Sequence, residues 1–327
     1  MITLGIESTA HTFGIGIITD KGKVLANVID AYKTQSGGLI PSELSRHHNE
    51  VKVRILQDAL RQAKVSIKDI GLVSFSQGPG IAPSLLVGLN FSREIAEKAK
   101  CPLVGVNHCV AHLEIANLIC KSKNPVLLYA SGANTQVIAY EGRKYRVFGE
   151  TLDQGVGNFL DQFARHIGLG FPGGPKIEKL ALSGKNYIEL PYVVKGMDVS
   201  FSGILTNLKQ KFDSKKFNLE DLAFSLQETA FAMLVEVAER AMAHCDKNEL
   251  ALGGGVSCNK RLQEMCRMMC RDRSAKFFAP PNEFLVDNGI QIAWLGALQK
   301  NESSKNYASF DITPYQRTDD VDVGWRI

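Results

Sequence analysis

Two histidines four residues apart are the feature of this sequence that most suggests chemistry. His108 and His112 lie in NHCVAHLEIA, directly after the apolar run Leu103–Val106. Side chains at positions i and i+4 project from one face of a helix, and Asn107 can cap such a helix by accepting a backbone N–H of its first turn. Imidazole nitrogens suit iron or zinc. The pair is therefore a candidate for two metal ligands, with histidines that simply pack in a core as the alternative.

The spacing of the two histidines also occurs in zinc proteases, but the rest of that pattern is missing. Those enzymes need a glutamate directly after the first histidine to act as general base. That position is Cys109 here, and Glu114 lies beyond the second histidine. A hydrolytic protease is therefore disfavoured.

Three glycine-rich turns suggest a nucleotide. They are SGANT (131–135), PGGP (172–175) and GGG (253–255). Small residues at such turns let backbone N–H groups approach phosphate oxygens, often at the start of a helix. Each turn alone is weak evidence, because glycine usually just permits a turn. Together they favour nucleotide binding, with Pro175 at the start of a helix and Glu178 in its opening turn, near a ribose.

Two similar units must position these residues. Residues 2–28 read as strand, polar loop, strand, turn and strand, and the same order returns at 126–149, where Ser131 corresponds to Ser8. A duplicated lobe explains the repeat most simply, and a chance match of two hairpin units is the alternative. Alternation of helices and strands elsewhere predicts a parallel or mixed sheet. The predicted helices are 42–63, 85–98, 152–168, 176–182, 219–244 and 259–272; the further strands are 71–76, 103–106 and 250–253.

Length and composition set broad limits. The chain has 327 residues, long enough for two domains, and a net charge of +4, which permits an RNA partner without arguing for one. Seven cysteines form no paired framework, the start resembles no signal peptide, and no apolar run is long enough to cross a membrane. These features predict a cytoplasmic protein with free thiols. The basic cluster Lys209–Lys216 is expected to be a solvated surface turn.

A series of motifs resembles one family along most of the chain. From Ile2 to Trp294, the sequence is similar to the archaeal and eukaryotic branch of the TsaD/YgjD family, the catalytic subunit of the KEOPS complex. The motifs are, in order, GIESTAHTFGIGI, FSQGPG, GVNHCVAHLEIA, YASGANTQVIAY, FGETLDQGVGN, FPGGPKIEKLA, KGMDVSFSG, GGGVSCNKRL and DNGIQIAW.

The resemblance implies a fold and a reaction. The fold is α/β, with two duplicated lobes of the actin, sugar-kinase and heat-shock-chaperone ATPase type and a cleft between them. We expect residues 1–122 plus about 300–327 in the N-terminal lobe and 123–299 in the C-terminal lobe. The reaction is transfer of a threonylcarbamoyl group from threonylcarbamoyl-adenylate to N6 of adenosine 37 in tRNAs that read ANN codons.

The resemblance also implies a site. One metal ion, iron or alternatively zinc, would act as a Lewis acid, held by His108, His112, Tyr129 and Asp287. The site would take an adenine nucleotide: threonylcarbamoyl-adenylate, or ATP, ADP or AMP in its place. Its expected contacts are Tyr129, Ala130, Ser131, Gly132, Ala133, Asp161, Gly174, Glu178 and Asn259. Glu7 is the candidate general base, with a carboxylate that stabilises its loop as the alternative.

Two residues depart from the family pattern. Ala133 replaces the usual glycine, which costs about 1 kcal/mol if the position needs a positive φ; otherwise its methyl group shifts a phosphate. Cys258 is the second, beside the expected adenine site.

The implied partners are tRNA, a small atypical protein kinase and the other KEOPS subunits; neither a membrane nor DNA is expected. Because this superfold hosts many chemistries, an ATPase or small-molecule kinase and a nucleotide-binding scaffold for a partner kinase remain alternatives.

Overall fold

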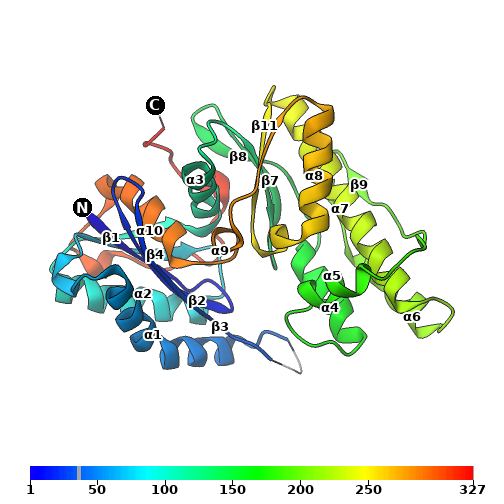
Figure 1. The fold of residues 1–327 in the computed structure, drawn as a ribbon. Helices are drawn as coiled ribbons and strands as arrows, with labels where there is room; N and C mark the ends of the chain where they lie inside the picture. The colour runs from blue at the N-terminus through cyan, green and yellow to red at the C-terminus, as the bar shows by residue number, and fades with distance from the viewer. Residues whose placement is uncertain (35–37, 327) are drawn as a thin grey trace.

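Two five-stranded sheets with the same topology form the framework of the protein (Figure 1). The computed structural model describes residues 1–34 and 38–326. The strand orders are β3-β2-β1-β4-β5 and β12-β11-β6-β7-β8. The first three strands of each sheet pair antiparallel, and the two later strands add in parallel. The predicted duplication and α/β fold class are therefore confirmed. The strands are β1 Ile2–Glu7, β2 Thr12–Thr19, β3 Val24–Ala31, β4 Leu72–Gly78, β5 Leu103–Asn107, β6 Val126–Ala130, β7 Thr135–Glu141, β8 Lys144–Glu150, β9 Val194–Lys195, β10 Asp198–Val199, β11 Glu249–Gly253 and β12 Lys276–Phe278.

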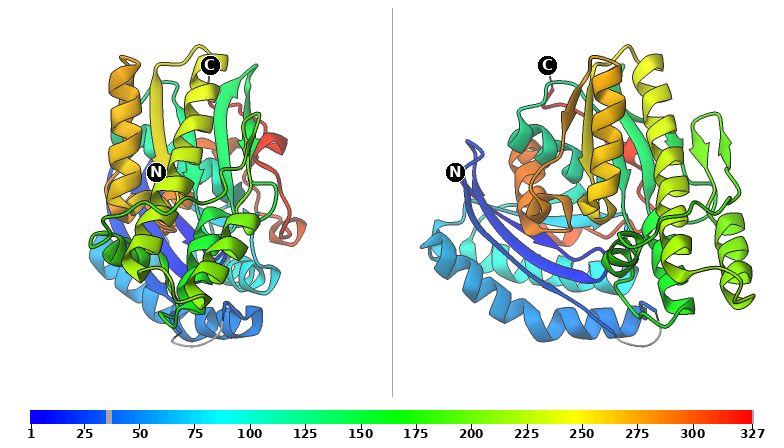
Figure 2. Two further views of the ribbon diagram at one scale, coloured as in Figure 1. Left: turned by 90° about the vertical axis from the view of Figure 1, so that its right-hand side faces the viewer. Right: turned by 45° about the vertical axis from the view of Figure 1, so that its right-hand side comes forward.

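Helices cover both faces of the first sheet. Helices α1 and α2 pack on one face and α10 on the other (Figures 1 and 2). The helices are α1 Pro41–Ala63, α2 Ala82–Ala99, α3 His108–Cys120, α4 Val156–His166, α5 Gly174–Ala181, α6 Ser202–Asp213, α7 Leu219–His244, α8 Lys260–Asp272, α9 Asn282–Leu285 and α10 Gly289–Leu298. Among the described residues, no helix is both long and apolar enough to span a membrane.

Helix α10 lies directly on the strands of the first sheet. A Cβ atom at Gly5 would lie 2.2 Å from the backbone nitrogen of Ala293, and one at Gly16 would lie 2.2 Å from that of Ile290. Only glycine allows so close an approach. The helix was expected in the C-terminal lobe, residues 123–299, yet its packing is with the first sheet. Periodicity alone predicts no helix here, because GIQIAWLGAL is largely apolar and has no amphipathic period. A helix after Asp287 was expected only from the resemblance.

Helix α3 lies between the two sheets. Its residues Val110 and Leu113 share one hydrophobic core with Val104 of the first sheet and Leu127 of the second. The helix that carries the histidine pair is therefore held from both sides. The segment after α10 contributes to this core too, through Val321, Val323 and Trp325.

Several predicted boundaries differ from the structure. The cluster Lys209–Lys216 is not a turn alone, because its first five residues end helix α6, which the sequence analysis missed. The helix predicted at 152–168 begins only at Val156, since the Asp153 carboxylate instead accepts the backbone N–H groups of Phe201 and Ser202. By contrast, α7 spans the predicted residues 219–244.

Candidate active site

The start of helix α3 is fixed by its cap. Asn107 accepts the backbone N–H of Val110 at 3.1 Å, as predicted. Its amide group donates to the side-chain oxygen of Gln316 at 3.2 Å and to the carbonyl of Arg317 at 3.3 Å. The cap thus also ties the helix to the segment that follows α10. This anchoring places His108 at the first helical position and His112 one turn later.

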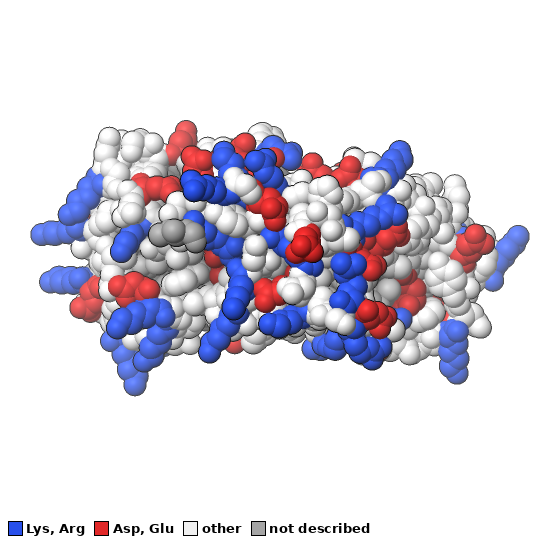
Figure 3. All heavy atoms as spheres, turned by 90° about the horizontal axis from the view of Figure 1, so that it is seen from above, with Lys and Arg blue, Asp and Glu red and all other residues white. Residues whose placement is uncertain are grey.

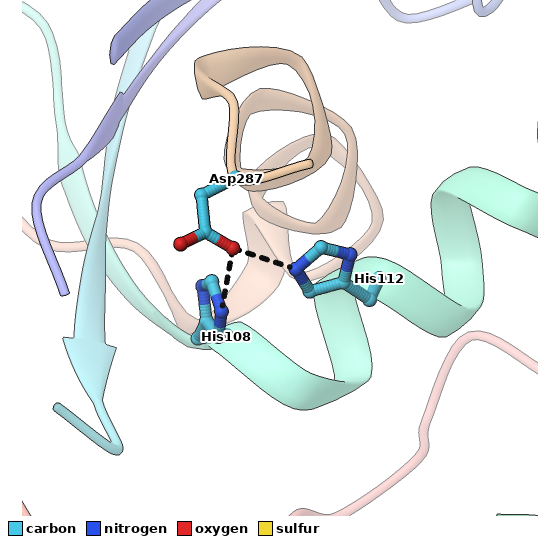
Figure 4. Close-up of side chains that lie close together, drawn as sticks. All are labelled: His108, His112 and Asp287. Carbon is cyan, nitrogen blue, oxygen red and sulfur yellow. Dashed lines mark hydrogen bonds and ion pairs between the residues drawn. The ribbon is translucent and has the colours of Figure 1, made fainter. Parts of the chain in front are cut away.

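The two histidines converge on Asp287, which precedes α10 (Figure 4). The Oδ1 atom of Asp287 lies 3.4 Å from Nε2 of His108 and 3.2 Å from Nε2 of His112. Ligand atoms that each lie about 2.1 Å from one ion are roughly 3.0–3.4 Å apart. The three side chains therefore fit a metal ion with little movement, and both histidines are almost fully buried.

Tyr129 brings the second sheet to this site. It is the penultimate residue of β6 and is fully buried. Its ring centroid lies 4.9 Å from that of His112. Burial raises the pKa of Tyr129 well above its ordinary value, and the nearby charge of Asp287 adds to the shift. The phenol is therefore protonated in the metal-free chain, and a phenolate ligand there requires a cation beside it.

Glu7 orients one of the histidines. Its Oε2 lies 2.8 Å from Nδ1 of His108, and its Oε1 accepts the backbone N–H and the hydroxyl of Thr9 at 2.6 and 2.5 Å. A histidine that donates from Nδ1 to a carboxylate presents its Nε2 lone pair to a metal. Both oxygens of the Glu7 carboxylate are thus engaged. The contact with Thr9 stabilises the loop after β1, which is the role given above as the alternative to a general base.

The electrostatics of the site call for positive charge. Burial acts to lower the pKa of His108, but the charges of Glu7 and Asp287 outweigh it and raise that pKa well above its ordinary value. Burial lowers the pKa of His112. Burial acts to raise the pKa of Asp287, but the two histidines hold it well below its usual range. In the metal-free chain a protonated His108 thus balances one of the two carboxylate charges, and a divalent metal ion would balance both.

Two of the glycine turns lie next to each other at the ends of β6 and β11. Gly254 has a φ of +87°, and a Cβ atom there would lie 2.4 Å from the carbonyl oxygen of Ala130. The SGANT turn receives the start of α4, since the N–H groups of Gly157 and Asn158 donate to the carbonyls of Ser131 and Gly132 at 3.0 and 2.9 Å. Backbone contacts therefore join the SGANT turn to the start of α4, and the GGG turn packs against the end of β6.

The third glycine turn is tied to the same region. Glu178 of α5 accepts the backbone N–H of Lys260 at 2.8 Å, and Asn259 caps α8 by accepting the N–H of Arg261 at 2.9 Å. Asp161 accepts the N–H of Gly173 at 2.6 Å, and burial raises its pKa. The structure thus links all three turns, although their nucleotide contacts remain predictions.

Two details of the predicted nucleotide site change. Helix α5 begins at Gly174, so Glu178 lies in its second turn and not in the opening one. Ala133 is not among the described non-glycine residues with positive φ, so the expected backbone cost does not arise there. Of the two predicted effects of Ala133, only the shift of a phosphate by its methyl group remains.

Sequence reasoning missed two polar residues near the histidines. Gln291 is fully buried, and its side-chain nitrogen lies 3.2 Å from Nε2 of His112. Glu114 is also buried and accepts the indole N–H of Trp325 at 2.8 Å, so it holds the segment after α10 against α3. The available signal was a single polar residue inside an apolar run, in GIQIAW and in HLEIA.

The repeated sheets define the class of protein as a two-lobed, ATPase-like α/β fold. HypF from Thermococcus kodakarensis has a TM-score of 0.63 over 92% of this chain and 48% of its own, at 15% identity. Component A of the (R)-2-hydroxyglutaryl-CoA dehydratase of Acidaminococcus fermentans has a TM-score of 0.59 over 92% of this chain and 99% of its own, at 14% identity. At such identities the likeness establishes the fold alone.

The sequence comparisons identify the family. The model of the TsaD family, described as tRNA N6-adenosine threonylcarbamoyltransferase, matches residues 23–294. A protein with that description from Thermococcus kodakarensis is 54% identical, over 99% of this chain and 100% of its own length. The chain belongs to the archaeal and eukaryotic branch of the TsaD family.

Two further relatives extend the comparison. A protein from Drosophila melanogaster described as a probable tRNA N6-adenosine threonylcarbamoyltransferase is 47% identical, over 99% of this chain and 98% of its own length. A probable bifunctional tRNA threonylcarbamoyladenosine biosynthesis protein from Methanocaldococcus jannaschii is 49% identical over 99% of this chain, which corresponds to 60% of the relative. These descriptions favour a transferase over the kinase and scaffold alternatives.

Proposed function

We propose that this chain transfers the threonylcarbamoyl group from threonylcarbamoyl-adenylate to N6 of adenosine 37 in tRNAs that read ANN codons. It is a tRNA-modifying transferase by family. The observation that carries the proposal is the convergence of His108, His112 and Asp287 on one buried point beside Tyr129, in a chain of this family.

The reaction needs a strongly activated donor. The exocyclic amine of adenine is a poor nucleophile because its lone pair is delocalised into the ring. The donor is a mixed anhydride with AMP as the leaving group, so negative charge develops on its oxygens as the C–O bond breaks. Positive groups fixed at that point lower the barrier without reorganising during the reaction.

Residues of both sheets would supply this environment. His108, His112, Tyr129 and Asp287 hold the metal ion, which when bound supplies a Lewis acid for the donor's oxygens. Two nitrogen and two oxygen donors suit iron, with zinc as the alternative. Glu7 keeps His108 in the tautomer that binds metal. The turns around Ser131, Gly174 and Gly254 hold the adenylate, so that donor and amine meet in a fixed orientation.

The proposal includes partners. Tight tRNA binding normally uses many phosphate contacts, each from a lysine or arginine. The net charge is only +4, and on the face seen in Figure 3 the basic side chains are interspersed with acidic ones. We therefore infer that partners help to hold tRNA. The family resemblance implies that these partners are a small atypical protein kinase and the other KEOPS subunits, and that the chain works in the cytoplasm.

The metal can be tested directly. Anaerobically purified protein should contain about one equivalent of iron or zinc. His112→Ala should lose this metal, because the three remaining expected ligands, His108, Tyr129 and Asp287, bind it too weakly. The measurement is elemental analysis, with circular dichroism as the check of folding and His244→Ala, an exposed histidine, as the control. Unchanged metal content in folded His112→Ala would refute the assignment.

The reaction is tested by reconstitution. Threonylcarbamoyl-adenylate, tRNA and the KEOPS partners are combined with wild-type chain or with His112→Ala, and modified adenosine is measured by nucleoside mass spectrometry. The wild-type chain should form product and the variant should not. Release of phosphate from ATP with a small-molecule acceptor and no tRNA would instead support a kinase of the same fold.

A further inference from the structure

The carboxamide of Gln291 reaches the proposed metal centre from helix α10. This side chain is fully buried, and its nitrogen lies 3.2 Å from Nε2 of His112. The carboxylate oxygen of Asp287 lies at the same distance from the same nitrogen. Three polar atoms from α3, α10 and the turn before α10 therefore meet at one point.

These contacts cannot all be hydrogen bonds. A ring nitrogen carries either a proton or a lone pair, so Nε2 of His112 can donate to Asp287 or accept from Gln291, but not both. The other ring nitrogen, Nδ1, has no partner among the described residues. A buried polar contact left unmade costs about 1–3 kcal/mol. The mismatch disappears if a cation takes the lone pair of His112 and the carboxamide presents its oxygen.

The neighbours of Gln291 permit that reversal. A half-turn about the last side-chain bond exchanges the nitrogen and the oxygen of a carboxamide without changing its shape. The oxygen of Gln291 now accepts only a 3.2 Å hydrogen bond from the amide of Asn288, and that amide also donates to the carbonyl of Val286 at 2.8 Å. Asn288 thus keeps its bond to Val286 when Gln291 turns, although the two amide nitrogens then face each other at 3.2 Å and must move slightly apart. After the turn, the oxygen lies 3.2 Å from Nε2 of His112, a separation typical of two ligands of one ion.

We propose that Gln291 is a further ligand of the metal ion, through its carboxamide oxygen, beside His108, His112, Asp287 and Tyr129. The inference rests on the metal centre of the proposed function and goes beyond its four expected ligands. An amide oxygen is a neutral ligand that suits divalent cations of the harder kind. It raises the coordination number without adding negative charge, so the ion stays a stronger Lewis acid than a third anionic ligand would leave it.

Cobalt(II) is the probe for this ligand, because its visible absorption grows stronger as its coordination number falls. Metal-free protein is titrated with cobalt(II), and affinity and spectrum are recorded for wild type, Gln291→Met and Gln291→Glu. Methionine has nearly the same shape but no oxygen, so its variant should bind at least tenfold more weakly, with stronger visible bands. Glutamate retains an oxygen, so its variant should keep the wild-type spectrum and bind at least as tightly.

A matched control is available in the same part of the chain. Gln299 is a buried glutamine that directly follows α10, and its carboxamide donates to Glu302. Gln299→Met should behave like wild type. If Gln291→Met does not fold, Gln291→Asn gives the same test, since it withdraws the oxygen by one methylene group.

The outcomes separate the two ideas. If wild type binds cobalt and Gln291→Met matches it in affinity and spectrum, Gln291 is no ligand, while the four-residue centre stands. If Gln291→Glu binds more weakly and Gln291→Met keeps the wild-type spectrum, the carboxamide acts only as a hydrogen-bond donor, and the inference is wrong. If wild type itself binds no cobalt, the metal centre of the proposed function fails together with this inference.

Discussion

Glu7, the candidate general base, lies where it can also orient a histidine of the candidate metal site. It was predicted as a general base, yet its Oε2 contacts Nδ1 of His108 at 2.8 Å. A carboxylate in this position orients a metal-binding histidine and raises its basicity, and loss of such a contact typically weakens metal binding about 10–100-fold. Glu7→Gln should therefore lower metal affinity by that factor, measured by competition with a chelator.

The control for this prediction is another buried glutamate. Glu249 accepts the backbone N–H groups of Lys123 and Asn124, away from the metal centre, so Glu249→Gln should leave metal affinity unchanged. A Glu7→Gln variant that binds metal normally but has lost turnover would restore the general-base role.

His48 makes the stability of the protein depend on pH. It is fully buried on α1, with its ring centroid 5.4 Å from that of Phe13. Burial lowers the pKa of His48 to about 4, and neighbouring His47 adds to the shift. The unfolded chain, with a histidine pKa near 6.5, binds the proton more readily, so stability contributed above pH 6.5 is lost as the pH falls towards 4.

The size of this effect is about 3 kcal/mol, because each unit of pKa corresponds to about 1.4 kcal/mol. His48→Leu should remove that part of the loss in the free energy of unfolding between pH 7 and pH 4.5, measured by urea denaturation. His244→Leu changes an exposed histidine and should keep the wild-type pH dependence. Equal pH dependence in all three proteins would contradict the prediction.

The chemistry of the site was only partly predictable from residues. The spacing of His108 and His112 indicated a shared helix face, and Asn107 indicated the helix cap, because both depend on local geometry. Tyr129 and Asp287 came only from the resemblance, since they lie on β6 and before α10 and reach the histidines through the fold. For Gln291 the signal was a single polar residue in an apolar run, which indicates a buried polar contact but not the group that the residue faces.

At the scale of elements, the turn between β11 and α8 offers a sharp test. Gly254 has a φ of +87° and lies against the carbonyl of Ala130. Gly254→Ala should strain the turn, push the ends of β6 and β11 apart, and cost roughly 1–3 kcal/mol. We expect weaker binding of AMP by calorimetry, with metal content retained.

Its neighbour provides the control. A Cβ atom at Gly255 would meet nothing within 4 Å, so Gly255→Ala should bind AMP as wild type does. If Gly254→Ala also binds AMP normally while its stability falls, the turn supports the fold but is not part of the nucleotide site.

Elements with a clear period were predicted well, and buried or short ones were not. The strand–loop–strand units of residues 2–28 and 126–149 were recognised because alternating residues and polar turns recur in both. Periodicity did not indicate α10, because it is apolar on nearly every side, and the helix was expected only from the resemblance. Helix α6 was missed because the basic end of its sequence resembles a surface turn. Patterns in the sequence report which face is exposed, so an element with no exposed face leaves no pattern.

At the scale of the whole molecule, the weak net charge leads to a prediction about tRNA. The isolated chain should bind tRNA weakly, and its affinity should be strongly salt-dependent, because the contacts it makes are mainly to phosphates. Modification of adenosine 37 should need the assembled complex or be greatly slowed without it. The measurement compares initial rates for chain and complex, with threonylcarbamoyl-adenylate supplied. Equal rates would show that the chain alone carries a sufficient tRNA site.

The position of α10 has a consequence for synthesis of the protein. The ribosome completes all five strands of the first sheet by Asn107, but the helix that covers their glycine-lined face follows only at Gly289. Until then, that apolar face of the nascent chain lacks its cover, and Asp287 is also missing from the metal centre. Both therefore arrive together. The order of translation thus completes the candidate metal site only when the helix that covers the first sheet is also available.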